Sequence, residues 1–229
     1  MNGSEKMKKG IIVITAIFVL VCAMKVQPVM AIPTLWLSDD GGSTWATAVD
    51  NETGDGNPLA GVVLFNNPVG NWIVNVATGV TMPVLGSAAS PHMDLGSINV
   101  FFNPSDTDSS GTLLIGLSED GFGPVDGWLT SSFGGVTSGT VEFATGINSI
   151  DPDAWISSFG PFTGAFSGST GAAVSLSPDD TLWLGASITH AAGGVGNTSF
   201  NYEVQVPEPG TFLLFGSSLI GLAFFRRRK

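Results

Sequence analysis

The sequence predicts an all-β protein: an antiparallel β-sandwich of jelly-roll type with about ten strands, flanked by an N-terminal signal peptide and a single C-terminal transmembrane helix. Three observations lead to this fold class. Short runs are rich in β-branched and aromatic residues, and clusters of Gly, Asn, Asp and Pro separate them at intervals of about ten residues. Between the two terminal segments, no stretch keeps the 3.6-residue apolar period of a helix.

The expected strands are residues 35–37, 44–49, 61–65, 72–77, 98–102, 112–117, 140–144, 172–176, 181–189 and 200–206. Alternation of apolar and polar residues is clearest in 72–76 and 200–206, which predicts one buried and one solvated face for those strands. Asp55-Gly56-Asn57-Pro58 is a typical turn between strands. Asp151 followed by Pro152 could begin a single helical turn, with the aspartate as its N-cap.

The predicted sandwich occupies residues 32–205 and is one domain. About 175 residues are enough to bury most of the apolar surface of the unfolded chain. Cys22 is the only cysteine and lies in the N-terminal segment, so the domain has no disulfide and no thiol for catalysis or metal binding. Its stability must come from its core.

Residues 1–31 have the composition of a signal peptide. Lys6, Lys8 and Lys9 precede the uncharged apolar stretch 10–24, and Val29-Met30-Ala31 offers small or tolerated residues before a cleavage site. We expect cleavage between Ala31 and Ile32. Export therefore implies the Sec translocon and signal peptidase as partners.

Residues 206–229 form a second processing segment. Val206-Pro207-Glu208-Pro209-Gly210 precedes the uncharged run 211–225, and four cations end the chain: Arg226, Arg227, Arg228 and Lys229. The two prolines predict an extended, accessible peptide. Fifteen helical residues rise about 22 Å, less than the ~30 Å hydrocarbon core of a bilayer. The cations predict a basic stop and a cytoplasmic C-terminus for a single-pass precursor in the inner membrane.

The order of acidic-proline motif, short apolar run and basic stop resembles the PEP-CTERM sorting signal. This resemblance covers about a tenth of the chain. It implies recognition by the transpeptidase exosortase, a Gram-negative host, and a mature form at the cell surface or outside the cell. A permanent single-pass anchor is the alternative.

Charge is distributed very unevenly along the chain. All eight Lys and Arg residues lie in the two terminal segments, whereas eighteen of the nineteen Asp and Glu residues lie between Ile32 and Phe225. A body without cations cannot neutralise phosphates, which excludes nucleic acid as a partner. It also excludes phosphoryl-transfer and Schiff-base chemistry that needs Lys or Arg. Divalent cations and cationic polymers are the natural counter-charges.

Two loop patterns are candidates for special structure. Residues 38–45, Ser-Asp-Asp-Gly-Gly-Ser-Thr-Trp, fit the Asp-box pattern, which we expect to stabilise a hairpin turn without catalysing a reaction. Residues 50–57 and 106–111 are rich in side-chain oxygens. A weak calcium site in one of these loops is an alternative to plain solvated turns. The loop that begins at Asp106 resembles only the first half of an EF-hand loop, because Leu117 stands where an EF-hand would need its bidentate acid.

The two histidines, His92 and His190, have no metal-binding or nucleophile motif around them. We therefore expect no catalytic residues, no bound cofactor and no enzymatic activity, although a glycosidase-type carboxylate pair is not excluded by sequence. The leading hypothesis is a structural or interaction protein of the cell exterior, and the resemblance of the tail to the PEP-CTERM signal implies a role in exopolysaccharide or biofilm. The alternative is a carbohydrate-binding module, in which some of the six tryptophans would stack on sugars, although core burial is expected for most of them. A secreted glycoside-active enzyme ranks third.

Overall fold

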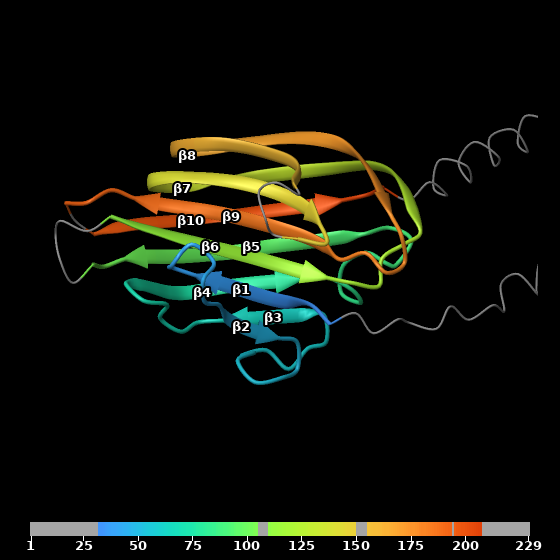
Figure 1. Ribbon diagram of the computed structural model, residues 1–229, viewed down its shortest axis with the longest axis horizontal. Coiled ribbons are helices and arrows are strands. Elements are labelled where there is room, and N and C mark those ends of the chain that lie inside the picture. The colour runs from blue at the N-terminus through green and yellow to red at the C-terminus, as the bar shows by residue number, and fades with distance from the viewer. Residues whose placement is uncertain (1–31, 105–109, 150–154, 194, 208–229) are drawn as a thin grey trace, which may run out of the picture.

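The computed structural model describes residues 32–104, 110–149, 155–193 and 195–207, and these form ten strands (Figure 1). The strands are β1 (Thr34–Ser38), β2 (Ala46–Val49), β3 (Val62–Phe65), β4 (Trp72–Val80), β5 (His92–Phe102), β6 (Gly111–Glu119), β7 (Val125–Ile147), β8 (Trp155–Leu176), β9 (Leu182–His190) and β10 (Gly196–Gln205). None of the described residues belongs to a helix that could cross a membrane. The predicted signal peptide, C-terminal helix and helical turn at Asp151 fall outside the described residues.

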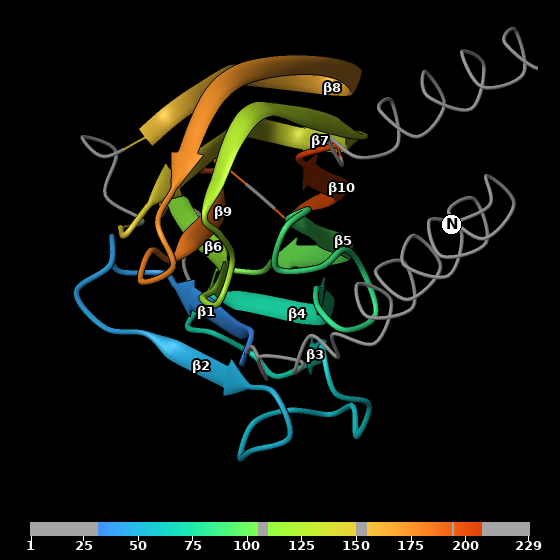
Figure 2. The same ribbon diagram turned by 90° about the vertical axis from the view of Figure 1, so that its right-hand side faces the viewer.

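All ten strands form one antiparallel sheet, in the order β2-β1-β6-β9-β7-β10-β5-β4-β3, with β8 paired to β7. The sheet folds over on itself, as the end-on view shows (Figure 2). We call β2-β1-β6-β9 the first wing and β10-β5-β4-β3 the second wing. The inner faces of the two wings pack against each other. The two wings of a single sheet therefore enclose one core, as the two separate sheets of a sandwich do.

The long strand β7 joins the wings because its two halves have different partners. Residues 130–137 pair with β10, and residues 140–147 pair with β9. At the change of partner, a Cβ atom on Gly139 would lie 2.1 Å from the carbonyl oxygen of Thr189, and one on Gly135 would lie 2.3 Å from that of Ser199. Glycine at these two positions therefore lets β7 approach both wings closely.

A single apolar core fills the space between the wings and extends under the β7–β8 hairpin. Tyr202 lies near its centre, fully buried, with its ring 5.0 Å from that of Phe143. The Tyr202 hydroxyl and the Thr145 hydroxyl are hydrogen-bonded at 2.5 Å, which satisfies both polar groups in the core. Under β8, the ring of Phe159 stacks on that of Phe133 at 4.9 Å.

The predicted all-β class and antiparallel arrangement are confirmed, and each predicted strand overlaps an observed one. The pattern missed most of the β7–β8 hairpin, however, because only 140–144 and 172–176 were expected to be strands there. The missed parts are rich in Gly and Ser, which have low strand propensity. They are held in the sheet by pairing with each other and by the phenylalanines beneath them.

Candidate functional site

The tryptophans mark one outer face of the molecule. The expectation that most of them are buried in the core is wrong, because only Trp72 is buried. Trp128 is 60% exposed on the part of β7 that precedes its pairing with β10. The remaining four are half-buried and gather on the outer face of the first wing and the adjoining hairpin: Trp36, Trp45, Trp155 and Trp183.

Strand alternation turns two of these tryptophans outward. Trp36 stands between Leu35 and Leu37, and Trp183 stands between two leucines of β9; all four leucines are fully buried. The indole nitrogen of Trp36 donates a 2.9 Å hydrogen bond to the Ser118 hydroxyl. The ring centroids of Trp36 and Trp183 lie 5.5 Å apart, so the two indoles form an aromatic pair that stabilises their positions on the surface.

Small residues separate the tryptophans on this face. Cross-strand pairing places Gly116 beside Trp36 and places Gly146 between Trp183 and Trp155. The outward positions of this part of the sheet that carry little or no side chain are Gly116, Ala144, Gly146 and Gly185. The result is a low floor between raised aromatic rings.

The Asp-box turn positions Trp45 at the edge of this floor. Asp40 accepts hydrogen bonds from the Thr44 amide at 2.9 Å and the Thr44 hydroxyl at 2.7 Å, and it contacts the Ser38 hydroxyl at 2.7 Å. These bonds lower the pKa of Asp40 to about 2, the Thr44 bonds contributing most. A Cβ on Gly42 would lie 3.2 Å from the Trp45 ring, so the glycine leaves room for the indole. The prediction of a structural turn is confirmed.

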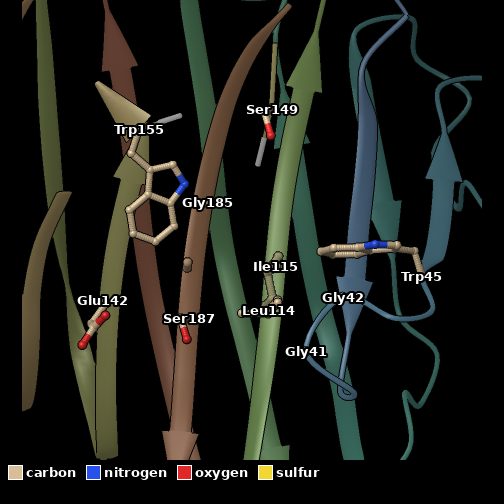
Figure 3. Close-up of a pocket in the computed structure, with 11 residues that line it drawn as sticks. Gly41, Gly42, Trp45, Leu114, Ile115, Glu142, Ser149, Trp155, Gly185 and Ser187 are labelled. Atoms are coloured by element: carbon tan, nitrogen blue, oxygen red, sulfur yellow. The ribbon is translucent and has the colours of Figure 1, made fainter. Parts of the chain in front are cut away.

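A hollow of about 480 Å³ lies between Trp45 and Trp155 (Figure 3). We call it the tryptophan hollow; its lining includes Trp45, Leu114, Glu142, Trp155, Gly185 and Ser187. The volume falls within the range of small-ligand sites. Glu142 is exposed, and of the described residues that line the hollow it alone is ionisable.

Two of the three carboxylates in the described acidic loop, residues 50–57, accept hydrogen bonds from backbone amides. Asp55 accepts hydrogen bonds from the amides of Asn51, Asn57 and Leu64, and Asp50 accepts one from the Gly61 amide at 2.9 Å. The described residues contain no group of three His, Cys, Asp or Glu side chains placed to hold a metal ion. Asp106 and Asp108 of the second loop fall outside the described residues, and calcium binding there stays a prediction.

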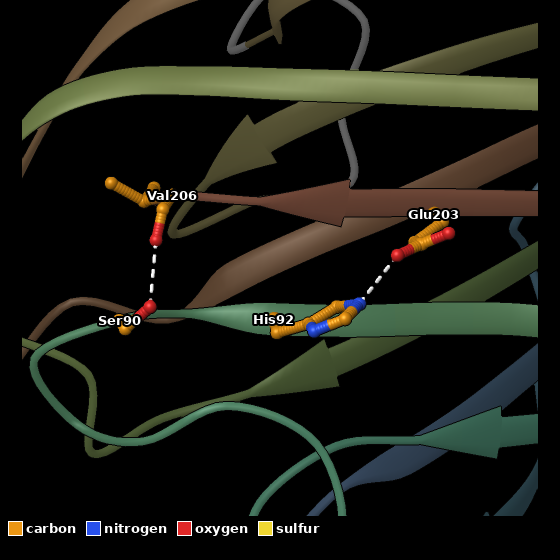
Figure 4. Close-up of polar contacts among 4 residues, drawn as sticks. All are labelled: Ser90, His92, Glu203 and Val206. Carbon is orange, nitrogen blue, oxygen red and sulfur yellow. Dashed lines mark hydrogen bonds and ion pairs between the residues drawn. The ribbon is translucent and has the colours of Figure 1, made fainter. Parts of the chain in front are cut away.

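The two histidines lie in different parts of the fold. His92 is on the outer face of the second wing, with its Nε2 atom 2.5 Å from a Glu203 carboxylate oxygen (Figure 4). Asp94 lies beside this pair on β5; burial and the neighbouring Glu203 raise its pKa, and His92 opposes that rise. His190 is buried against the rings of Trp72 and Phe102. The structure therefore does not bring the histidines together.

The structure describes Ile32, which follows the predicted signal peptide, and the first two residues of the predicted sorting segment, Val206 and Pro207. Ile32 is exposed, Val206 is buried, and Pro207 is exposed. The predicted sites at Ala31, Glu208, Pro209 and Gly210 and the basic stop 226–229 lie outside the described residues, so both cleavage sites stay predictions.

Comparison with solved structures found distant similarities. One structure is described as TmCBM61 in complex with beta-1,4-galactotriose (14% identity, TM-score 0.31, covering 67% of this chain and 92% of that one). Others are a family 35 carbohydrate binding module from Clostridium thermocellum (12%, 0.27, 62% and 90%) and E. coli ycfD (15%, 0.22, 86% and 47%). Similarity this low says nothing about the ligand of this chain.

No curated protein matches the sequence. A protein-family model does match its end: residues 205–229 fit the PEP-CTERM protein-sorting motif. The motif includes the proline-flanked Glu208, the apolar run and the basic stop on which the sequence prediction rested. The chain therefore carries a PEP-CTERM sorting motif, which marks it as an exosortase-targeted surface protein that is exported as a membrane-anchored precursor and processed.

Proposed function

We propose that this protein is a surface component that binds extracellular polysaccharide through the tryptophan hollow, and that it acts in an exopolysaccharide matrix or biofilm. The observation that carries the proposal is a hollow lined by Trp45 and Trp155 on an outer sheet face that also carries two further half-buried tryptophans, Trp36 and Trp183. Partly exposed indoles with a low floor between them offer flat apolar faces on which sugar rings can stack.

We also propose that the site binds its ligand without cleaving it. Glycoside hydrolysis requires two carboxyl groups on either side of the scissile bond. Glu142 is the one carboxylate among the described residues lining the hollow. A binding site with a single carboxylate supports a matrix or adhesion role over the enzymatic alternative.

The test is polysaccharide binding by the full-length protein in a detergent that contains no sugar. We expect binding to at least one extracellular polysaccharide, and we expect Trp45→Ala and Trp155→Ala each to weaken it strongly. Trp128→Ala is the matched control, because Trp128 is an exposed tryptophan outside the hollow. Failure of the protein to bind any glycan would favour a passive structural component, and equal losses in all three variants would disprove the assigned site.

A further inference from the structure

Charge limits what the tryptophan hollow can bind. Residues 32–205 contain seventeen Asp and Glu residues and no Lys or Arg. A polysaccharide made of uronic acids, or one carrying phosphate or sulfate groups, would meet repulsion from this surface and would find no cation to pair with. Acidic polymers are therefore poor ligands for this face.

The carboxylate of Glu142 further restricts the kind of ligand that the hollow can bind. Its carboxylate stands on the rim of the hollow, on the outward side of β7, and forms no hydrogen bond or ion pair with any described residue. Ser149 and Ser187 also line the hollow, and Ser187 lies directly opposite Glu142 in the pairing of β7 with β9. An unpaired carboxylate favours a ligand that brings a hydrogen-bond donor, and above all a charged one.

The two tryptophans that line the hollow also favour a positively charged ligand. Trp45 and Trp155 flank the hollow in which Glu142 stands (Figure 3). The face of an indole attracts an ammonium group through the ring quadrupole, and tryptophan is the best side chain for this interaction. Aromatic faces together with one carboxylate are thus suited to a cation that is attached to an apolar, ring-shaped body.

We infer that the hollow recognises amino sugars that carry a free ammonium group, within a polysaccharide that is partly or fully deacetylated. Glu142 accepts hydrogen bonds from the ammonium group, and Trp45 and Trp155 pack on the sugar rings. This inference rests on the proposed function, since it names the sugar chemistry for the same site.

The experiment compares oligomers of glucosamine with oligomers of N-acetylglucosamine of the same linkage and length, bound to the full-length protein at a pH at which the free amines are protonated. We expect the glucosamine oligomer to bind about tenfold more tightly, the effect of one charge-assisted hydrogen bond. Added salt should reduce this preference. Glu142→Gln should remove the preference while leaving the weaker binding of the acetylated oligomer unchanged.

Asp126→Asn is the matched control, because Asp126 is an exposed acid at the other end of β7, outside the hollow. Asp126→Asn removes one negative charge, as Glu142→Gln does. It should nevertheless keep the full preference, because Asp126 does not line the hollow. Equal or tighter binding of the acetylated oligomer, or a preference that survives Glu142→Gln, would overturn the inference but leave polysaccharide binding intact. Binding of neither oligomer would overturn the inference; absence of binding to every glycan would overturn the proposed function with it. Stronger binding of oligolysine at the same site would replace the amino sugar by a cationic peptide.

Discussion

The Ser90 hydroxyl donates a 2.8 Å hydrogen bond to the backbone carbonyl oxygen of Val206 (Figure 4). The Val206 amide donates to the Pro91 carbonyl oxygen at 2.8 Å, and the Val206 side chain is 2% exposed. The sorting motif begins at residue 205, so the folded body extends into the first residues of the motif. Pro207 is the first residue after this anchor and is exposed.

This anchor predicts where processing can occur. A transpeptidase needs an extended, accessible peptide, whereas residues up to Val206 are held by β5 and β7 or by the Ser90–Pro91 loop. We expect the mature C-terminus to fall at or beyond Pro207. Mass spectrometry of the surface-released protein should find Val206 in its last peptide, and a terminus before Val206 would contradict the prediction.

Ser90→Ala tests the anchor itself. Loss of one hydrogen bond costs about 1 kcal/mol, which corresponds to roughly fivefold faster hydrogen exchange of the Val206 amide if local opening exposes it. Ser169→Ala, an exposed serine on β8, should leave that exchange rate unchanged. An unchanged rate in Ser90→Ala would mean that the hydroxyl does not stabilise the anchor.

Glu119 predicts that stability falls as the pH rises. The side chain is 1% exposed, and neither carboxyl oxygen has a hydrogen-bond partner among the described residues, although Thr81 and the Met82 amide lie nearby. Burial raises the pKa of Glu119 from 4.5 to about 8. The unfolded chain therefore loses this proton first, and stability falls between these two pH values by an amount on the order of 4 kcal/mol.

Denaturant unfolding measured across this pH range checks the prediction for Glu119. Glu119→Gln stays neutral and should flatten the decline, whereas Glu142→Gln, at an exposed position, should leave its slope unchanged. A decline of equal slope in Glu119→Gln would assign the effect to another group.

His190 predicts the opposite dependence on the acid side. Burial lowers the pKa of His190 below its usual 6.5. The Nε2 atom lies 3.0 Å from the Thr198 hydroxyl, and the ring packs beside Trp72 and Phe102. The unfolded chain binds the proton first as the pH falls, so stability is full above 6.5 and declines below it.

An NMR titration of the imidazole signals checks the His190 prediction, with His92→Asn used to assign the other ring. His190→Asn should remove the part of the acid-side decline that comes from this ring. A His190 ring that titrates at the usual value or above it would contradict the prediction.

The sequence predicted the strands whose stability comes from their own side chains. In β10, Phe200, Tyr202 and Val204 alternate with polar residues, and all three are buried as the period of two requires. The β7–β8 hairpin has no such local signal along most of its length. Its position depends on pairing between distant residues, such as Ser131 with Thr170, which no local pattern shows.

The alternation of inward and outward residues along a strand could have predicted part of the candidate site, but this prediction was not made. In Leu35-Trp36-Leu37 and Leu182-Trp183-Leu184, inward leucines require outward tryptophans, although each tryptophan viewed alone suggests a core residue. The grouping of these with Trp45 and Trp155 could not be predicted, because it depends on the order β1-β6-β9-β7. Glu142 lacked any sequence signal, since its role follows only from its position beside the hollow.

The Asp-box turn provides the last prediction, that Asp40 supports ligand binding without touching the ligand. Asp40→Ala removes the acceptor for the Thr44 amide and hydroxyl, one residue before Trp45. We expect Trp45 to become more mobile and polysaccharide binding to weaken several-fold, while the core, on the other side of the sheet, stays folded. Fluorine NMR of fluorotryptophan-labelled protein measures the mobility, and glycan titration measures the affinity.

Asp39→Ala is the matched control, because Asp39 is the adjacent exposed acid and accepts none of the hydrogen bonds that hold this turn. Asp40→Asn should restore part of the affinity, since its amide oxygen can still accept from the Thr44 amide. The lowered pKa of Asp40, about 2, places the loss of its charge far into the acid range, so this turn should not weaken binding at mildly acidic pH. Equal affinities in Asp40→Ala and Asp39→Ala would show that the turn does not position Trp45 for binding.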